Sequence, residues 1–82
     1  MRVVLRSAES GLFFLGSGRW TPSRNAAFDF ERPEKAAKTA RGLGLDRMEV
    51  VFVSEFGAED MIVPLELVRE DGGEGPEGTK AG

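Results

Sequence analysis

The hydrophobic positions of the first twenty residues predict an antiparallel β-hairpin. Arg2-Val3-Val4-Leu5-Arg6 is a short run rich in β-forming residues, and Gly11 to Leu15 is a second such run. Ser7 to Gly11 has the length and composition of a hairpin loop, in which Gly11 is free to adopt a positive φ. Gly16-Ser17-Gly18 then ends the second strand.

The next ten residues predict a short extended piece, a turn and a brief strand. Arg19-Trp20-Thr21 is the extended piece, and Pro22 presets φ for a turn among small polar residues. In Ala26 to Phe30, alternation places Phe28 and Phe30 on one face of a brief strand and Asp29 on the other.

One helix is predicted after this strand. Pro33 suits the first helical turn, where a missing N–H costs nothing, and Gly42 or Gly44 supplies a left-handed stop. The spacing of four small or apolar residues gives a narrow stripe: Ala36, Ala37, Ala40 and Leu43. Because most of this stripe is alanine, we expect the helix to lie close against a sheet whose strands supply the bulky side chains.

Two further β runs complete the pattern, Met48 to Phe56 and Met61 to Val68. In the second, Met61, Val63, Leu65 and Leu67 alternate toward one face. Pro64 cannot donate to a ladder, which predicts an edge strand or a bulge.

These elements predict an α+β fold, a two-layer sandwich of a mainly antiparallel sheet of four to five strands with one helix. The order is β-β-(short β)-α-β-β. Residues 1–68 form a single small domain in this interpretation. Residues 69–82, which contain no apolar residue larger than alanine, form a disordered acidic tail rich in glycine.

The Met48 to Val53 run carries more apolar surface than one helix covers, on both of its faces. If both faces are buried, we expect the tail or a second chain to cover the second one. The predicted partner surface has four members, Val51, Val53, Ile62 and Pro64.

Composition narrows the class of protein. The chain has 82 residues, 40% hydrophobic and 30% charged, as in a small folded soluble domain. It contains no cysteine, which favours a reducing cytoplasm, and its apolar runs are too short to span a bilayer.

Charge divides along the chain, and this leaves two alternatives open. Residues 19–47 carry seven basic and four acidic side chains, whereas residues 48–68 carry five acidic and no basic ones. A net charge of −3 argues against a general nucleic-acid binder. A weak nucleic-acid binder remains the alternative, through an anion-binding face made of Arg19, Arg24, Lys35, Lys38 and Arg41.

The glycines and aromatic residues of the first thirty positions favour structure over ligand binding. A dinucleotide fingerprint needs a glycine at position 21 and a helix directly after the loop, but Thr21 and a proline turn follow instead. The aromatic side chains would stack bases if they were exposed. We expect them to form the core instead: Phe13 or Phe14 together with Trp20, Phe28 and Phe30.

Candidate catalytic chemistry is sparse. The chain has no His, Cys or Tyr, so the commonest proton shuttle and the strongest nucleophile are missing. Glu55, Glu59 and Asp60 could gather around a hard cation, although a solvated acidic turn is the simpler interpretation. We therefore predict a protein that is not an enzyme and has no cofactor and no metal.

In the order of its motifs, the chain resembles a set of small bacterial proteins that have no established activity. The resemblance is carried by Gly-Leu-Phe-Phe-x-Gly-x₃-Trp-Thr from Gly11, Ala-x-Asp-Phe from Ala27, an alanine-rich helix and the run ending Ile-Val-Pro-Leu at Leu65. The resemblance implies the layout of a Gly-aromatic-aromatic hairpin, a helix and a C-terminal hydrophobic hairpin, and it implies no activity. The expected function is a non-enzymatic protein-interaction or structural module, with an unknown protein partner or a homodimer and no membrane.

Overall fold

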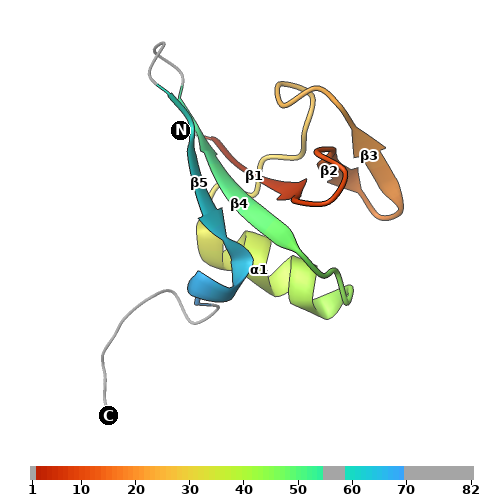
Figure 1. Cartoon of the computed structure of the whole chain (residues 1–82), viewed down its shortest axis with the longest axis vertical. Coiled ribbons are helices and arrows are strands. Elements are labelled where there is room, and N and C mark those ends of the chain that lie inside the picture. The colour runs from red at the N-terminus through yellow and green to blue at the C-terminus, as the bar shows by residue number, and fades with distance from the viewer. Residues whose placement is uncertain (1, 55–58, 70–82) are drawn as a thin grey trace.

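Residues 2–54 and 59–69, which the computed structural model of the chain describes, form a five-stranded antiparallel sheet with one α-helix on one face (Figure 1). The sheet order is β3-β2-β1-β4-β5. The elements are β1 (Arg2–Ser7), β2 (Phe13–Gly16), β3 (Arg19–Thr21), α1 (Pro33–Gly42), β4 (Met48–Val53), β5 (Met61–Pro64) and the 3₁₀ turn η1 (Leu65–Leu67). The predicted α+β class and element order are confirmed.

The core on the helix side combines bulky strand residues with small helix residues. The central strand β1 pairs with β4 along its whole length, from Arg2 opposite Val53 to Ser7 opposite Met48. Alternate strand residues such as Leu5 and Val50 are fully buried against the alanines of α1. Those alanines, Ala36, Ala37 and Ala40, are themselves completely inaccessible. The predicted alanine-faced helix is confirmed.

The aromatic side chains extend this core toward β2 and β3. Phe14 and Phe30 are each only 6% exposed, and their ring centroids are 5.7 Å apart. Trp20 packs edge-on against Phe14 at 5.7 Å and is partly buried. These rings form the core, as predicted, but Phe28 is 50% exposed and its expected burial is wrong.

Residues 26–30 do not form the predicted strand. β1 and β2 are paired through Arg6 and Phe13 and then separate, so this segment fills the gap between them. Its backbone forms hydrogen bonds with both strands. The N–H of Phe28 donates to the Phe14 carbonyl of β2 at 3.0 Å, and the N–H of Phe30 donates to the Val3 carbonyl of β1 at 2.8 Å. A segment whose hydrogen bonds alternate between two diverging strands cannot continue a regular ladder with either.

The second face of the sheet is covered by the chain itself over β1 and β4, whereas Ile62 on β5 stays exposed. Val4, Val51 and Val53 form a buried cluster with Ala27, and the partly buried Phe13 packs against it. At Val51 and Val53, residues of the same chain thus supply the cover that was expected from the tail or a second chain. The tail lies outside the described residues, and coverage of the rest of this face by a second chain stays a prediction.

The C-terminus of α1 differs from the predicted stripe in one residue. The N–H of Gly44, at φ +70°, donates to the Arg41 carbonyl, and the N–H of Leu45 donates to the Ala40 carbonyl. This is a Schellman motif, which turns the chain at Gly44 and packs Leu45 against the core. Leu43 is 49% exposed as a result, so its predicted place in the buried stripe is wrong.

The C-terminal strands are shorter than predicted. β4 ends at Val53, and Phe56 lies outside the described residues. β5 ends at Pro64 rather than at Val68, because η1 follows and turns Leu65 into the core. The predicted tail lies beyond the described residues except for Arg69. Within the described part of the chain, no helix is long and apolar enough to cross a membrane.

Candidate functional site

β5 is an edge strand, as Pro64 predicted. It occupies the last position in the sheet order and pairs with β4 from Met61 opposite Phe52 to Pro64 opposite Glu49. No other described strand lies on its outer side. The outer side of an edge strand presents backbone N–H and C=O groups to which another chain can pair.

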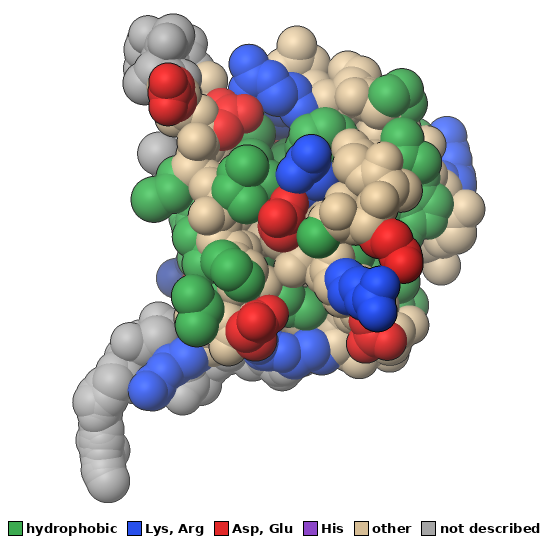
Figure 2. Space-filling view, viewed as in Figure 1, with side chains coloured by type: hydrophobic (Ala, Val, Ile, Leu, Met, Phe, Trp, Pro, Cys, Tyr) green, Lys and Arg blue, Asp and Glu red, His purple; other side chains and the backbone are tan. Residues whose placement is uncertain are grey.

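Exposed hydrophobic side chains gather along this edge. Met61 is 57%, Ile62 50% and Leu67 70% exposed, and Pro64 is exposed as well. Figure 2 shows the hydrophobic side chains following β5 and η1 along one margin of the molecule. Of the five large hydrophobic residues that are exposed in the described part of the chain, three therefore belong to this one edge. Exposed hydrophobic side chains gathered along one edge mark interaction sites more often than single scattered residues do.

A groove of about 360 Å³ runs beside the edge on the helix side of the sheet. Its lining comes from the start of α1, from β4 and β5, and from η1 and the two residues after it: Pro33, Glu34, Phe52, Val63, Leu67, Val68 and Arg69. Arg41 fixes one wall of the groove, since its Nη2 donates to the carbonyls of Leu65 at 3.0 Å and Val68 at 2.8 Å. The groove is therefore held in shape by a hydrogen-bonded tie between α1 and η1.

The carboxylates near the edge fall into two groups. Asp60 receives two hydrogen bonds from Arg24 Nη1, at 2.9 and 2.8 Å, and Glu49 receives one from Arg6 Nη1 at 2.7 Å. Glu59 and Glu66, which lie just before and just after β5, are exposed and make no ion pair with another described residue. The net negative charge at this edge is thus concentrated at the two ends of the strand.

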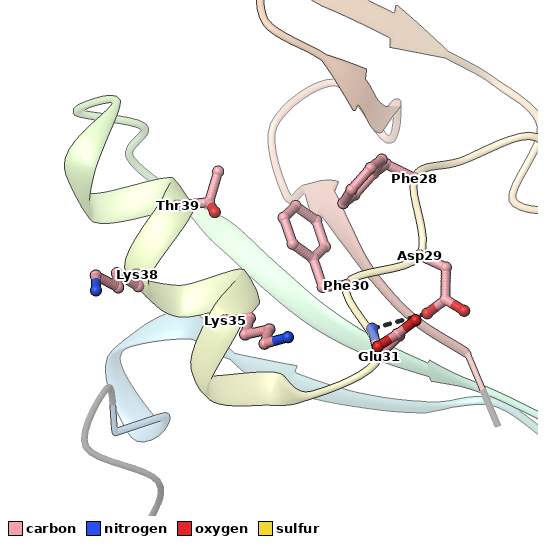
Figure 3. Close-up of a pocket in the computed structure, with 7 residues that line it drawn as sticks. All are labelled: Phe28, Asp29, Phe30, Glu31, Lys35, Lys38 and Thr39. Carbon is pink, nitrogen blue, oxygen red and sulfur yellow. Dashed lines mark hydrogen bonds between the residues drawn. The ribbon is translucent and has the colours of Figure 1, made fainter.

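A second hollow, of about 420 Å³, lies between α1 and the segment before it (Figure 3). It is lined by Phe28, Asp29, Phe30, Glu31, Lys35, Lys38 and Thr39. The rings of Phe28 and Phe30 meet edge to face, with centroids 4.8 Å apart. Figure 3 shows Lys38 and the Asp29 carboxylate pointing away from the rings, so the charged groups do not converge on one point in the hollow.

Asp29 has a structural task. Its Oδ1 accepts hydrogen bonds from the N–H groups of Val3 at 3.0 Å and Glu31 at 2.9 Å, and the second bond holds Glu31 at a φ of 72°. The hydrogen bond from Val3 lowers the pKa of Asp29 below its ordinary value; partial burial opposes this, and the bond from Glu31 and the charge of Arg2 lower it further.

We expect Asp29→Asn to flatten the acid limb of the stability profile. A carboxyl group whose pKa is lowered by folding contributes stability that is fully present above its unfolded-state pKa, near 3.8, and is lost as the pH falls through the lower folded-state pKa. At neutral pH the variant should lose about 1–2 kcal/mol, because two charge-assisted hydrogen bonds become neutral ones. Urea unfolding between pH 7 and pH 2.5, followed by Trp20 fluorescence, measures both effects. Asp46→Asn removes the same charge from an exposed site and is the control; parallel acid limbs for Asp29→Asn and the wild type contradict the assignment.

The four residues of the predicted partner surface are divided by the structure. Val51 and Val53 are 2% and 4% exposed, so they contribute to the core and offer no surface to a partner. Ile62 and Pro64 are exposed on β5. Sequence reasoning missed Leu67 because a strand continuing to Val68 would have kept it on the same face as Val63 and Leu65. It missed Met61 because this residue shares the face of Val63 but lies at the start of the edge strand, where it is 57% exposed. Pro64 was the one signal that the strand ends there.

The five residues of the predicted anion-binding face are not gathered on one surface. Arg19 lies on β3 and Arg24 binds Asp60 beside β5, at the opposite edge of the sheet. Lys35, Lys38 and Arg41 share α1, but Arg41 is engaged with the carbonyls of Leu65 and Val68. Only the two exposed lysines remain as neighbouring cations of this set on the helix.

Metal ligation finds no support in residues 2–54 and 59–69, where no three acidic side chains gather closely enough to hold an ion. Glu55 of the acidic trio lies outside the described residues. Comparison of the chain with protein-family models, with curated proteins and with solved structures finds no match. The resemblance to small bacterial proteins thus stays an expectation, and the features that bear on function are those of the surface itself.

Proposed function

We propose that this chain is a non-enzymatic protein-interaction module that binds an extended segment of another protein along the outer edge of β5. The observation that carries the proposal is the coincidence of two features on one strand. β5 has an open hydrogen-bonding side, and three of the five exposed large hydrophobic residues in the described part of the chain lie on it or in η1 directly after it, namely Met61, Ile62 and Leu67. Strand addition uses both features, since backbone pairing supplies affinity and side-chain pockets supply specificity.

The geometry of the edge supports this mode of binding over a flat hydrophobic contact. An added strand would alternate its side chains between the two faces of the sheet. On one face they would meet Ile62, which is paired with Val51. On the other face they would enter the groove beside Val63 and Leu67, whose wall is fixed by Arg41. Because the groove is preformed, little ordering of the protein opposes binding.

Ile62→Lys is expected to weaken binding of an extended peptide about threefold to tenfold. Half of the isoleucine side chain is exposed now and would be buried by the added strand, so its replacement loses roughly 1 kcal/mol of apolar burial. The probe is an end-blocked eight-residue peptide with six alternating valine and threonine residues between two glutamines. Titration followed by backbone amide NMR shifts gives both the affinity and the binding site.

Leu43→Lys is the matched control, because Leu43 is 49% exposed but lies at the C-terminus of α1, away from β5. Lysine is well tolerated on edge strands, and unfolding followed by Trp20 fluorescence checks that both variants fold. Shifts confined to β5 and η1 that are lost in Ile62→Lys and kept in Leu43→Lys support the proposal. Shifts that centre on the Phe28 hollow, or an affinity that falls equally in both variants, refute it.

A further inference from the structure

The distribution of unpaired charge along the β5 edge indicates what kind of segment it selects. Glu59 and Glu66 flank the strand, both are exposed, and no described cation pairs with either. By contrast, Asp60 is neutralised by Arg24 and Glu49 by Arg6. The four residues of β5 span roughly 13 Å at the rise of a β-strand, so the two free carboxylates lie beyond the two ends of that span.

The other charges at the groove do not cancel this pattern. Arg69 is the cation in the groove lining, and Glu34 lines the same groove. Glu34 is itself 3.2 Å from Arg32. The charges on the helix side are therefore mixed, whereas the unpaired charges that flank the edge strand, on Glu59 and Glu66, are both negative.

A second copy of the chain fits this edge poorly. Antiparallel pairing of two β5 strands about a twofold axis places the Glu59 end of one copy beside the Glu66 end of the other. Like charges facing each other across an antiparallel pair are destabilising. Pro64 lacks an N–H, which shortens the ladder that two such edges can form. The edge is thus better suited to a different strand than to itself.

We propose, on the basis of the proposed function, that the occupant of the β5 edge is an extended segment with an apolar, alternating centre and a basic residue at each end, beyond the four residues that pair with β5. The basic residues lie against Glu59 and Glu66, and the apolar side chains lie against Ile62 and in the groove beside Val63. Rim charges of this kind act chiefly on specificity and on the rate of association.

Three end-blocked peptides test the proposal. They share the alternating valine–threonine centre of six residues and differ only at their two ends, which are both lysine, both glutamine or both glutamate. We expect the lysine peptide to bind about threefold to tenfold more tightly than the glutamine peptide, and the glutamate peptide to bind more weakly than either. Raising the ionic strength from about 0.05 to 0.5 M should reduce the differences, because exposed charges are screened over a few ångströms at high salt.

The protein side of the test uses two double variants with the same change in net charge. Glu59→Gln with Glu66→Gln should equalise the affinities for the three peptides. Glu31→Gln with Asp46→Asn removes two exposed carboxylates elsewhere and should preserve the wild-type ranking. A ranking lost equally in both double variants would show a general effect of net charge and would overturn the proposal.

The remaining outcomes separate this proposal from the proposed function. Equal affinity for all three peptides at low salt overturns the basic-segment proposal and leaves strand addition at β5 intact. Failure of all three peptides to bind overturns both. Sedimentation velocity supplies the last outcome: a wild-type dimer that Ile62→Lys dissociates would make the occupant a second copy and would overturn the basic segment.

Discussion

Replacing Phe30 with alanine is expected to lower the free energy of unfolding by about 3–5 kcal/mol. The ring is 6% exposed, stacks on Phe14 and meets Phe28 at a centroid distance of 4.8 Å. Its neighbours on the helix side are alanines, which cannot extend to fill the space that the ring leaves. Because domains of this size have unfolding free energies of only about 5–15 kcal/mol, the loss would bring the variant close to its unfolding midpoint in water. Urea unfolding followed by Trp20 fluorescence and by circular dichroism measures it.

Phe28→Ala is the matched control for this prediction. It removes the same ring two positions away, from a side chain that is 50% exposed, so we expect a loss of about 1 kcal/mol. The two variants together distinguish a buried core ring from a ring at the rim of a surface hollow. Equal losses, or a larger loss in Phe28→Ala, would contradict the assignment of Phe30 to the core.

The parts of the fold that the sequence predicts are those governed by local periodicity. The run Arg2 to Arg6 is a short continuous stretch of β-forming apolar residues, and the alanine stripe of α1 has a clear helical period; both patterns are local to their segments. The positive φ values of Gly11 and Gly44 likewise follow from turn chemistry that is local to each position. Agreement between local preference and tertiary packing is what makes these elements predictable.

The segment 26–30 was unpredictable from its own residues. Its alternation is that of a strand, and Phe28 and Phe30 do lie close together while Asp29 turns away (Figure 3). Whether it forms a strand depends on the separation of β1 from β2, which no residue in the segment encodes. The role of Asp29 likewise depends on a distant part of the chain, because its carboxylate accepts a hydrogen bond from the N–H of Val3, 26 positions earlier.

The candidate site was predicted only in part, for a related reason. Ile62 and Pro64 follow from alternation and from the missing N–H of proline, and both lie on the exposed edge. The exposure of Leu67 depends on η1, which Arg41 ties to the helix from 24 and 27 positions away. The burial of Val51 and Val53 depends on Ala27, which packs against them on the second face of the sheet. Contacts between residues so far apart in the sequence produce no hydrophobic periodicity in the strands that they bury.

Ala40→Leu is expected to destabilise the domain by about 2–3 kcal/mol, although leucine is nearly as good a helix former as alanine. Ala40 is completely inaccessible and lies in the stripe by which α1 contacts the sheet. A leucine there must push the helix away from Leu5 and Val50, both of which are fully buried, so that packing is lost along the whole contact. Chemical denaturation gives the loss, and a shift in the Trp20 emission maximum reports the displaced aromatic cluster.

Lys38→Leu separates the steric effect from the chemistry of leucine itself. It adds the same side chain to the same helix at an exposed position, where we expect a change within about 0.5 kcal/mol. The contrast between the two sites tests the role of the alanine stripe. Strand residues and aromatic rings fill the space between helix and sheet, and the small alanine side chains let α1 lie close to the sheet. An Ala40→Leu variant as stable as Lys38→Leu would mean that this space is not filled. It would then be wrong that three alanines of α1 pack closely against one core of eight larger side chains: Val3, Leu5, Phe14, Phe30, Met48, Val50, Leu65 and the partly buried Trp20.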